Sequence, residues 1–427
     1  MPPFFSVVIP TRNRSSLARL AAGYVLSQDF ADLELLLLDN SDTPDLRNAD
    51  FKDLRCKVVA SERVLSMRDN WERTLDIAAG EYILVLSDKD MLLSGALRRL
   101  AEAIHATDTD MITYRKAGFS DNETGSSFIQ RCTGQTTERR AQFVLRAWFD
   151  EVRHFHDAPM TYNSAVRRDV LLELKRSNGR FFTGTSPDIG SGAVLMAKLK
   201  KYHLLDRPLV VSWYGNWSIG MASLRGTQGA AAAFIAEYGT DPIRDAGLVT
   251  GIPGSVAETL LECKKQFPTL FASCRVRWSA YVASVMWDLF RKERAGLDTR
   301  ADRQFLRVWR DKQYSWLARS LGIWRFHWER ADLVRRMRTR AARLASMLAR
   351  PTRKTTHDGP YYADSGERIG GSFEREMDAY FRVSLSGASS FRDVPSLMLP
   401  PSLDLESVLS IANEINCRLD KQFDGPR

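Results

Sequence analysis

Two aspartates, Asp88 and Asp90, stand two residues apart directly after the apolar run Tyr82–Leu86. A run of this kind predicts a strand buried on both faces, so both carboxylates would leave the same strand end. Hard divalent ions such as Mg²⁺ or Mn²⁺ prefer oxygen ligands, and one or two carboxylates with phosphate oxygens are enough to hold them. The spacing favours a site for a metal ion and a diphosphate group, although such pairs also occur by chance.

A second acidic cluster, Asp39–Asp42, follows another apolar run, Leu33–Leu38. Either cluster taken alone fits a solvated turn, because Asp, Asn and Ser are common turn residues. Ligands of parallel sheets, however, bind beyond the carboxyl ends of the strands. Two polar clusters at equivalent strand ends therefore favour a binding cleft at that edge of the sheet.

The elements that must position these residues alternate between strands and helices. Apolar residues at helical spacing predict a helix that begins at Ser15 or Ser16. The same spacing predicts helices over Met67–Ala79, with Gly80 at the expected helix end, and over Leu93–His105. We expect strands at Phe5–Ile9, Leu33–Leu38, Cys56–Ala60, Tyr82–Leu86, Met111–Tyr114 and Leu209–Trp213. Alternation of this kind forms βαβ units, so the sequence predicts an α/β, Rossmann-like fold with a mostly parallel sheet flanked by helices.

The motifs in this order resemble those of family 2 glycosyltransferases with the GT-A fold. The resemblance covers about residues 4–240, and its segments read FSVVIPTRNR, LLLLDNSDTPD, MRDNWERTLDIAAGEYILVLSDKDMLL and SPDIGSGAVLMA. The stretch with NWER, GEYI and a D-x-D pair is similar to one bacterial branch of that family. Each motif is modest alone, and the combination is specific.

The resemblance implies a role for each residue that matches a family motif. The nucleotide would be bound by Pro10, Thr11, Arg14, Asp39, Ser41, Asn70 and Asp88. Asp88 and Asp90 would hold Mg²⁺ or Mn²⁺, and Asp188 would be the general base that takes a proton from the acceptor hydroxyl. The implied reaction is a single displacement with inversion, moving a sugar from a nucleotide-diphosphate sugar to a saccharide or lipid-linked acceptor in surface polysaccharide synthesis.

Two of these assignments have alternatives. Lys89 occupies a slot that is acidic in many relatives, so it could neutralise phosphate directly in an enzyme that needs no metal. Asp188 follows Ser186 and Pro187, which is also an ordinary helix start with a favourable acidic first turn.

Other functions are weaker readings of the same chain. His154, His156 and Asp157 could share a metal, but nothing nearby in the sequence completes a ligand set. A sugar nucleotidyltransferase is disfavoured because PTRNR lacks a glycine-rich basic loop. A non-catalytic protein that binds sugar nucleotides or polyanions is a further alternative, in which Lys89 marks a decayed metal site.

The positive charge of the chain is concentrated in one block. The whole sequence has 61 Lys and Arg against 52 Asp and Glu, a net charge of +9, whereas residues 275–354 alone have 21 against 7 and six of the ten tryptophans. Residues 333–354 combine eight basic residues with an apolar stripe at helical spacing, a pattern typical of helices on anionic membrane surfaces. A helical domain with a solvated basic face is the alternative, and nucleic-acid binding is less favoured.

The domain prediction follows from these shifts in composition. We expect a GT-A domain over 1–240, with a nucleotide-sugar half at about 1–115 and an acceptor half at about 116–240. A basic, Trp-rich helical region would span 241–350 as a C-terminal extension, and 351–427 would be a linker and helical tail. Five scattered cysteines, no apolar run near the roughly 18 residues of a spanning helix and no secretory signal predict a cytoplasmic protein, peripheral on the inner face of the plasma membrane.

Overall fold

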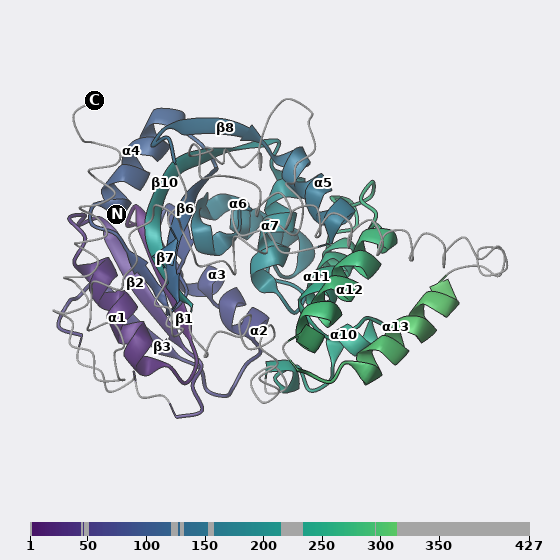
Figure 1. Ribbon diagram of the computed structural model, residues 1–427. Coiled ribbons are helices and arrows are strands. Elements are labelled where there is room, and N and C mark those ends of the chain that lie inside the picture. The colour runs from purple at the N-terminus through teal and green to yellow at the C-terminus, as the bar shows by residue number, and fades with distance from the viewer. Residues whose placement is uncertain are drawn as a thin grey trace, which may run out of the picture.

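A ten-stranded mixed sheet forms the centre of the molecule in the computed structural model (Figure 1). The structure describes residues 2–43, 46, 51–120, 127–128, 132–152, 158–214, 234–294 and 296–313. The strands are β1 Phe5–Thr11, β2 Leu33–Asp39, β3 Cys56–Ala60, β4 Tyr82–Val85, β5 Asp90–Leu92, β6 Met111–Ser120, β7 Ser127–Phe128, β8 Thr136–Arg140, β9 Ser164–Arg167 and β10 Lys201–Tyr214. All six strands expected from the sequence are present.

The strand order is β3-β2-β1-β4-β9-β6-β10-β5, with β7 beside β6 and β8 beside β10. β1 is parallel to β2 and β4, and β2 is parallel to β3. Since β9 is antiparallel to both β4 and β6, and β10 is parallel to β6, the strands β6 and β10 run in the same direction as β1–β4. The carboxyl ends of β1, β2 and β4 therefore lie at one edge.

Proline does not end β1, contrary to the expected strand Phe5–Ile9. The strand continues through Pro10, paired with Leu38, to Thr11, paired with Asp39. The backbone nitrogen of Pro10 faces β4, as the backbone groups of Val8 do, and the Val8 carbonyl accepts from the Leu86 N–H. The pairing of β1 with β4 ends at Val8, so β4 offers Pro10 no partner. The missing N–H of Pro10 thus removes no ladder hydrogen bond.

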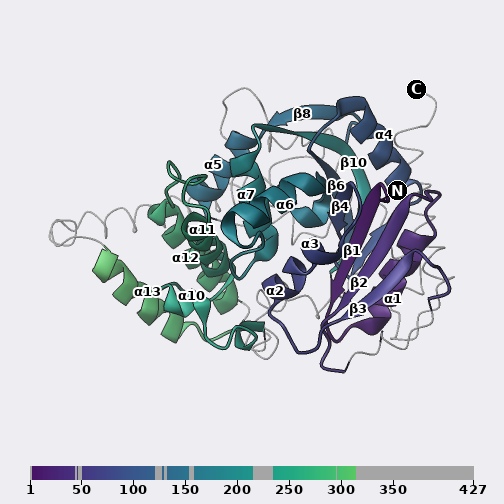
Figure 2. The ribbon, with the colours of Figure 1, turned by 180° about the vertical axis from the view of Figure 1, so that it is seen from behind.

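The helices cover both faces of the sheet (Figures 1 and 2). They are α1 Ser15–Leu26, α2 Met67–Glu72, α3 Thr74–Ile77, α4 Ala96–Thr107, α5 Ala141–Glu151, α6 Arg168–Asn178, α7 Pro187–Lys198, α10 Pro242–Asp245, α11 Ile252–Gln266, α12 Trp278–Arg294 and α13 Arg300–Gln313. The helix predicted at Met67–Ala79 is divided at Arg73 into α2 and α3.

Gly80 is required for a reason other than helix termination, because α3 already ends at Ile77. A Cβ on Gly80 would lie 2.4 Å from the backbone nitrogen of Ser6, and the Gly80 N–H donates to the Ser6 hydroxyl at 2.7 Å. The chain therefore enters β4 in direct contact with β1, which aligns the ends of the two strands.

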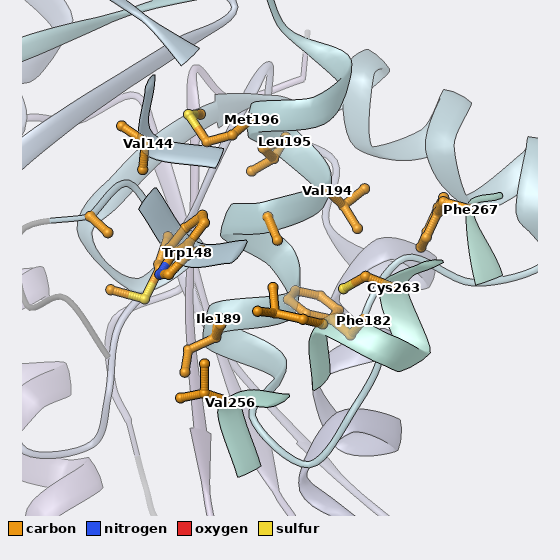
Figure 3. Packing of buried hydrophobic residues seen from close by; sticks show 14 of the residues in the cluster. Val144, Trp148, Phe182, Ile189, Val194, Leu195, Met196, Val256, Cys263 and Phe267 are labelled. Atoms are coloured by element: carbon orange, nitrogen blue, oxygen red, sulfur yellow. The ribbon is translucent and has the colours of Figure 1, made fainter. Parts of the chain in front are cut away.

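Side chains alternate along the strands into two hydrophobic cores. Val7 and Leu35 belong to the core under α1 and α4, whereas Val8 and Leu36 belong to the core on the opposite face. The second core extends through α7 into α11: Ile189 and Leu195 of α7 lie near Val256 and Cys263 of α11 (Figure 3).

The predicted helical extension is present as far as Gln313, and its helices α11 and α12 share this core with α5 and α7. The boundary at 240 stays a prediction, as does the division after it. The part of the predicted helical region 241–350 that follows Gln313, and the whole of the predicted linker and tail 351–427, lie outside the described residues. Within the described ranges, every helix is too short or too polar to cross a membrane.

Candidate functional site

Asp88 lies where the ends of β1 and β4 meet. Its Oδ2 accepts a hydrogen bond from the Thr11 hydroxyl at 2.8 Å and lies 3.0 Å from Nε of Arg14. Burial raises the pKa of Asp88, and the charge of Arg14 and the hydrogen bond from Thr11 oppose that rise. Three of the predicted residues, from two segments of the chain, thus form one cluster beside Pro10.

The loops after β1 and β2 are joined to each other. The backbone N–H of Asn13 donates to the Ser41 hydroxyl at 2.8 Å, and Asn13 exchanges side-chain and backbone hydrogen bonds with Asp42. Asn13 has a φ of 55°, a left-handed conformation that Asn tolerates better than most residues. Asp39, at the end of β2, is 1% exposed and accepts from the backbone N–H of Ser41 at 3.0 Å.

Asn70 lies on the Asp39 side of the site. Arg73 donates to the Asn70 side-chain oxygen at 2.9 Å and to the carbonyls of Val59 and Ala60 at the end of β3. Burial lowers the pKa of Arg73, and the nearby Asp39 carboxylate opposes that decrease. The predicted nucleotide-binding residues therefore fall into two groups, one around Asp88 and one around Asp39.

Asp90 begins β5 and is paired with a cation from β6. Lys116 Nζ lies 2.5 Å from Asp90 Oδ2, and the Ser212 hydroxyl of β10 donates to Oδ1 at 2.5 Å. Lys116 also lies 4.2 Å from the ring centroid of Tyr162, and the charge of Asp188 acts on it. Lys116 is thus bound to one predicted site residue, Asp90, and is within electrostatic range of another, Asp188.

Asp188 occupies the first turn of α7, after Pro187 at the start of the helix. The loop before it is fixed by α11: Glu258 accepts hydrogen bonds at 2.7 Å and 2.8 Å from the N–H and hydroxyl of Thr185. The Thr259 hydroxyl accepts from the Ser186 N–H at 3.0 Å. A helix of the C-terminal extension therefore positions the candidate base.

The Asp88 and Asp90 carboxylates do not fit a metal site as they lie. Asp88 is 1% and Asp90 0% exposed, and each is paired with a cation of the protein. Lys89 stands between them, attracted by Asp90 and Asp88, and burial lowers its pKa to about 8. The described ranges contain no group of three or more His, Cys, Asp or Glu that could hold a metal ion. The predicted ion stays a prediction.

Sequence reasoning missed Lys116 and Glu258. Neither belongs to a quoted motif, and only the order of the strands and the packing of α11 on α7 bring them to the site. His154, His156 and Asp157 lie outside the described residues.

Residues 6–171 match the model of the family described as Glycosyl transferase family 2. This segment includes Thr11, Arg14, Asp39, Asp88 and Asp90, and it ends before Asp188. The α/β sheet with helices on both faces is the GT-A fold that was predicted, and this prediction is confirmed.

Two curated relatives are glycosyltransferases. The chain is 35% identical over 105 residues to the GalNAc(5)-diNAcBac-PP-undecaprenol beta-1,3-glucosyltransferase of Campylobacter jejuni, covering 23% of this chain and 34% of that protein. It is 20% identical over 195 residues to the glycosyltransferase GlyG of Streptococcus pneumoniae, covering 43% and 62%. The chain thus spans less than two thirds of the length of both relatives.

Among solved structures, the chain is similar to a fragment of S. aureus TarS, with 16% identity and a TM-score of 0.37. That alignment covers 73% of this chain and 88% of the TarS fragment. The complex of the same fragment with UDP-GlcNAc gives a TM-score of 0.39.

Proposed function

We propose that this protein is an inverting glycosyltransferase that moves a sugar from a nucleotide-diphosphate sugar to a saccharide or lipid-linked acceptor. The observation that carries the proposal is the family match over residues 6–171, which contains the cluster of Thr11, Arg14 and Asp88. The curated relative from C. jejuni bears the name of a glucosyltransferase with an undecaprenol-linked acceptor, which supports the lipid-linked class and a role in surface polysaccharide synthesis.

The nucleotide would lie along the ends of β1, β2 and β4. Asp39, with Ser41 beside it, would accept a hydrogen bond from the base, and Asn70 would lie on the same side. Pro10, Thr11 and Arg14 would border the phosphates and ribose beside Asp88. This assignment puts the nucleotide at the carboxyl ends of the parallel strands, where sheets of this type bind their ligands.

Asp188 would act as the general base. Its carboxylate would accept the proton of the acceptor hydroxyl as the hydroxyl oxygen attacks the anomeric carbon, and the bond to the nucleoside diphosphate would break on the opposite face. Lys116, which is bound to Asp90 and interacts with the charge of Asp188, would lie between the donor and the acceptor. Inversion follows from a single displacement.

The protein would work at the cytoplasmic face of a membrane without spanning it. The basic residues of 275–354 would contact anionic headgroups there, close to a lipid-linked acceptor. Residues 333–354, which carry the predicted amphipathic helix, lie outside the described residues.

The direct test is turnover on a panel of UDP-, GDP- and dTDP-sugars with saccharide and polyprenyl-linked acceptors. We expect one donor to be consumed only when an acceptor is present, with NMR showing an inverted anomeric configuration in the product. Release of pyrophosphate from a nucleoside triphosphate and sugar phosphate would indicate a nucleotidyltransferase instead. Thermal stabilisation by a sugar nucleotide without any turnover would indicate a binding protein and would contradict the proposal.

A further inference from the structure

Three cationic side chains of the protein interact with the two aspartates of the D-x-D pair. Arg14 is bound to Asp88 at 3.0 Å, and Lys116 is bound to Asp90 at 2.5 Å. Lys89, between them in the chain, interacts electrostatically with both carboxylates and with both of these cations. Three cations of the protein thus act on the two carboxylates of the D-x-D pair.

The carboxylate oxygens are already used by protein donors. Asp90 Oδ1 accepts from Ser212, and its Oδ2 accepts from Lys116 and from the backbone N–H of Ser87. Asp88 Oδ2 accepts from the Thr11 hydroxyl and forms an ion pair with Arg14, and Asp88 Oδ1 accepts a long hydrogen bond of 3.5 Å from the Ser87 hydroxyl. Mg²⁺ keeps several water ligands when it binds to one or two carboxylates. Asp88 is 1% and Asp90 0% exposed, so a hydrated ion would have to displace the cations that now contact these carboxylates.

Lys89 lies between Asp88 and Asp90 in the chain, and the described residues offer no third acidic side chain that would complete a metal site with these two. A carboxylate there would set three neighbouring carboxylates against the two cations Arg14 and Lys116 and would favour a divalent ion. An ammonium there supplies the positive charge itself, and an ammonium is a common point-charge ligand of phosphate.

We propose that fixed cations replace the divalent ion in this protein: Lys89 binds the donor's diphosphate, while Arg14 and Lys116 hold the two aspartates in place. The inference rests on the proposed function and assigns the donor activation to this chain's own residues. Asp88 and Asp90 then serve to orient cations and ribose rather than to ligate a metal.

The transfer step balances without a metal. The acceptor oxygen forms a bond to the anomeric carbon with its own electron pair, and its proton passes to Asp188. The bond from the anomeric carbon to the β-phosphate oxygen breaks, and its electron pair stays on that oxygen. The Lys89 ammonium keeps its proton and stabilises the charge that develops there.

The test is nucleotide binding by calorimetry, with UDP, GDP and dTDP as probes, in EDTA and in Mn²⁺. We expect the wild type to bind one of them with a Kd that changes less than about twofold between the two conditions. Lys89→Ala should weaken binding about 10- to 100-fold in both conditions, since a charged hydrogen bond to phosphate is lost. Lys89→Asp should weaken it in EDTA, and Mn²⁺ should restore it. Lys52→Asp, an exposed lysine outside the site, is the charge-matched control.

Each outcome has a distinct meaning. Wild-type binding or turnover that EDTA abolishes and Mn²⁺ restores would overturn the inference and leave glycosyl transfer standing. Equal binding by Lys89→Ala and the wild type would also overturn it. If no nucleotide binds and no donor is consumed, the proposed function fails together with the inference. Melting temperatures of the variants confirm that they are folded.

Discussion

At the scale of single residues, Lys116 and Asp90 form a more deeply buried ion pair than Arg14 and Asp88 do. The Asp90 side chain is 0% exposed and that of Lys116 10% exposed, so neither charge is screened by much water. Removing one partner of a buried ion pair leaves the other charge buried without a counter-ion, which costs about 3–5 kcal/mol of stability. We predict that Lys116→Met lowers the free energy of unfolding in urea by this order.

A double-mutant cycle isolates the pair from its surroundings. In an Asp90→Asn background, Lys116→Met should cost much less, because no carboxylate is left without a partner. Equal losses in both backgrounds would show that Lys116 acts through packing on Tyr162, whose ring centroid lies 4.2 Å from its ammonium nitrogen, rather than through its charge.

Asp188 is the residue on which the reaction depends in the proposed mechanism. We predict that Asp188→Asn lowers kcat by about 100- to 10,000-fold, because an amide cannot accept the acceptor's proton, while nucleotide affinity stays the same. The matched control is Asp169→Asn, which removes an acidic residue from the first turn of α6. Both variants lose a similar helix-dipole contribution of about 0.3–1 kcal/mol, so a kinetic effect limited to Asp188 separates catalysis from helix stability.

The sequence was informative for residues that belong to a recognisable motif, even where two motifs from distant segments form one cluster. Thr11, Arg14 and Asp88 were predicted as one site, and they are in contact. Lys116 was not predicted because a lysine in a strand has no motif. Its partner is 26 positions away, and the two meet through the β5–β10–β6 arrangement.

At the scale of elements, long apolar runs predicted the strands well, since strands buried on both faces must be apolar throughout. The short strands β5 and β9 went unnoticed because three or four residues carry too little pattern to distinguish them from loops. The antiparallel β9 between β4 and β6 is a feature of topology, and no local preference in Ser164–Arg167 encodes it.

Glu258 of α11 accepts two hydrogen bonds from Thr185 in the loop before α7, an interaction that we call the clamp. The clamp gives a pH-dependent prediction. Burial raises the pKa of Glu258 above its ordinary value of 4.5, although hydrogen bonds from Thr185 and Thr259 oppose the rise. Its contribution to stability is therefore complete below about 4.5 and is lost as pH rises through the folded-state pKa. Glu258→Gln cannot titrate. We predict that the unfolding free energy of this variant, relative to wild type, increases between pH 4.5 and neutrality; a constant difference would contradict the assignment.

The same clamp should affect turnover. Glu258→Ala removes the acceptor of the Thr185 N–H and leaves that buried donor unpaired, at a cost of about 1–3 kcal/mol, whereas the Thr185 hydroxyl keeps its hydrogen bond with Ser255. We predict a lower kcat with an unchanged KM for the donor, because the loosened loop precedes Asp188 and not the nucleotide residues. Glu262→Gln, one turn along α11 with its side chain 33% exposed, should leave both constants as in the wild type. A parallel change in KM would instead indicate general unfolding.

At the scale of the whole molecule, charge is divided along the chain. Residues 275–354 carry a net charge of +14, while the whole protein carries +9, so the remainder is acidic by 5. Arg14 and Lys116 of the site are paired with aspartates, so they add little to long-range attraction. Attraction to an anionic surface should therefore come from the basic block alone.

This division predicts where the protein binds membranes. We expect the full-length chain to sediment with vesicles of phosphatidylglycerol and phosphatidylcholine but not with phosphatidylcholine alone, and to dissociate at high salt. Reversing four charges within 333–354 should abolish that binding, and the changes are Arg335→Glu, Arg336→Glu, Arg338→Glu and Arg340→Glu. The control reverses four exposed charges elsewhere, namely Lys52→Glu, Arg63→Glu, Arg98→Glu and Arg176→Glu. Equal loss of vesicle binding in both variants would mean that net charge alone governs binding. If the protein binds a single-stranded nucleic acid but not the vesicles, the ligand of residues 275–354 is a polyanion and not a membrane.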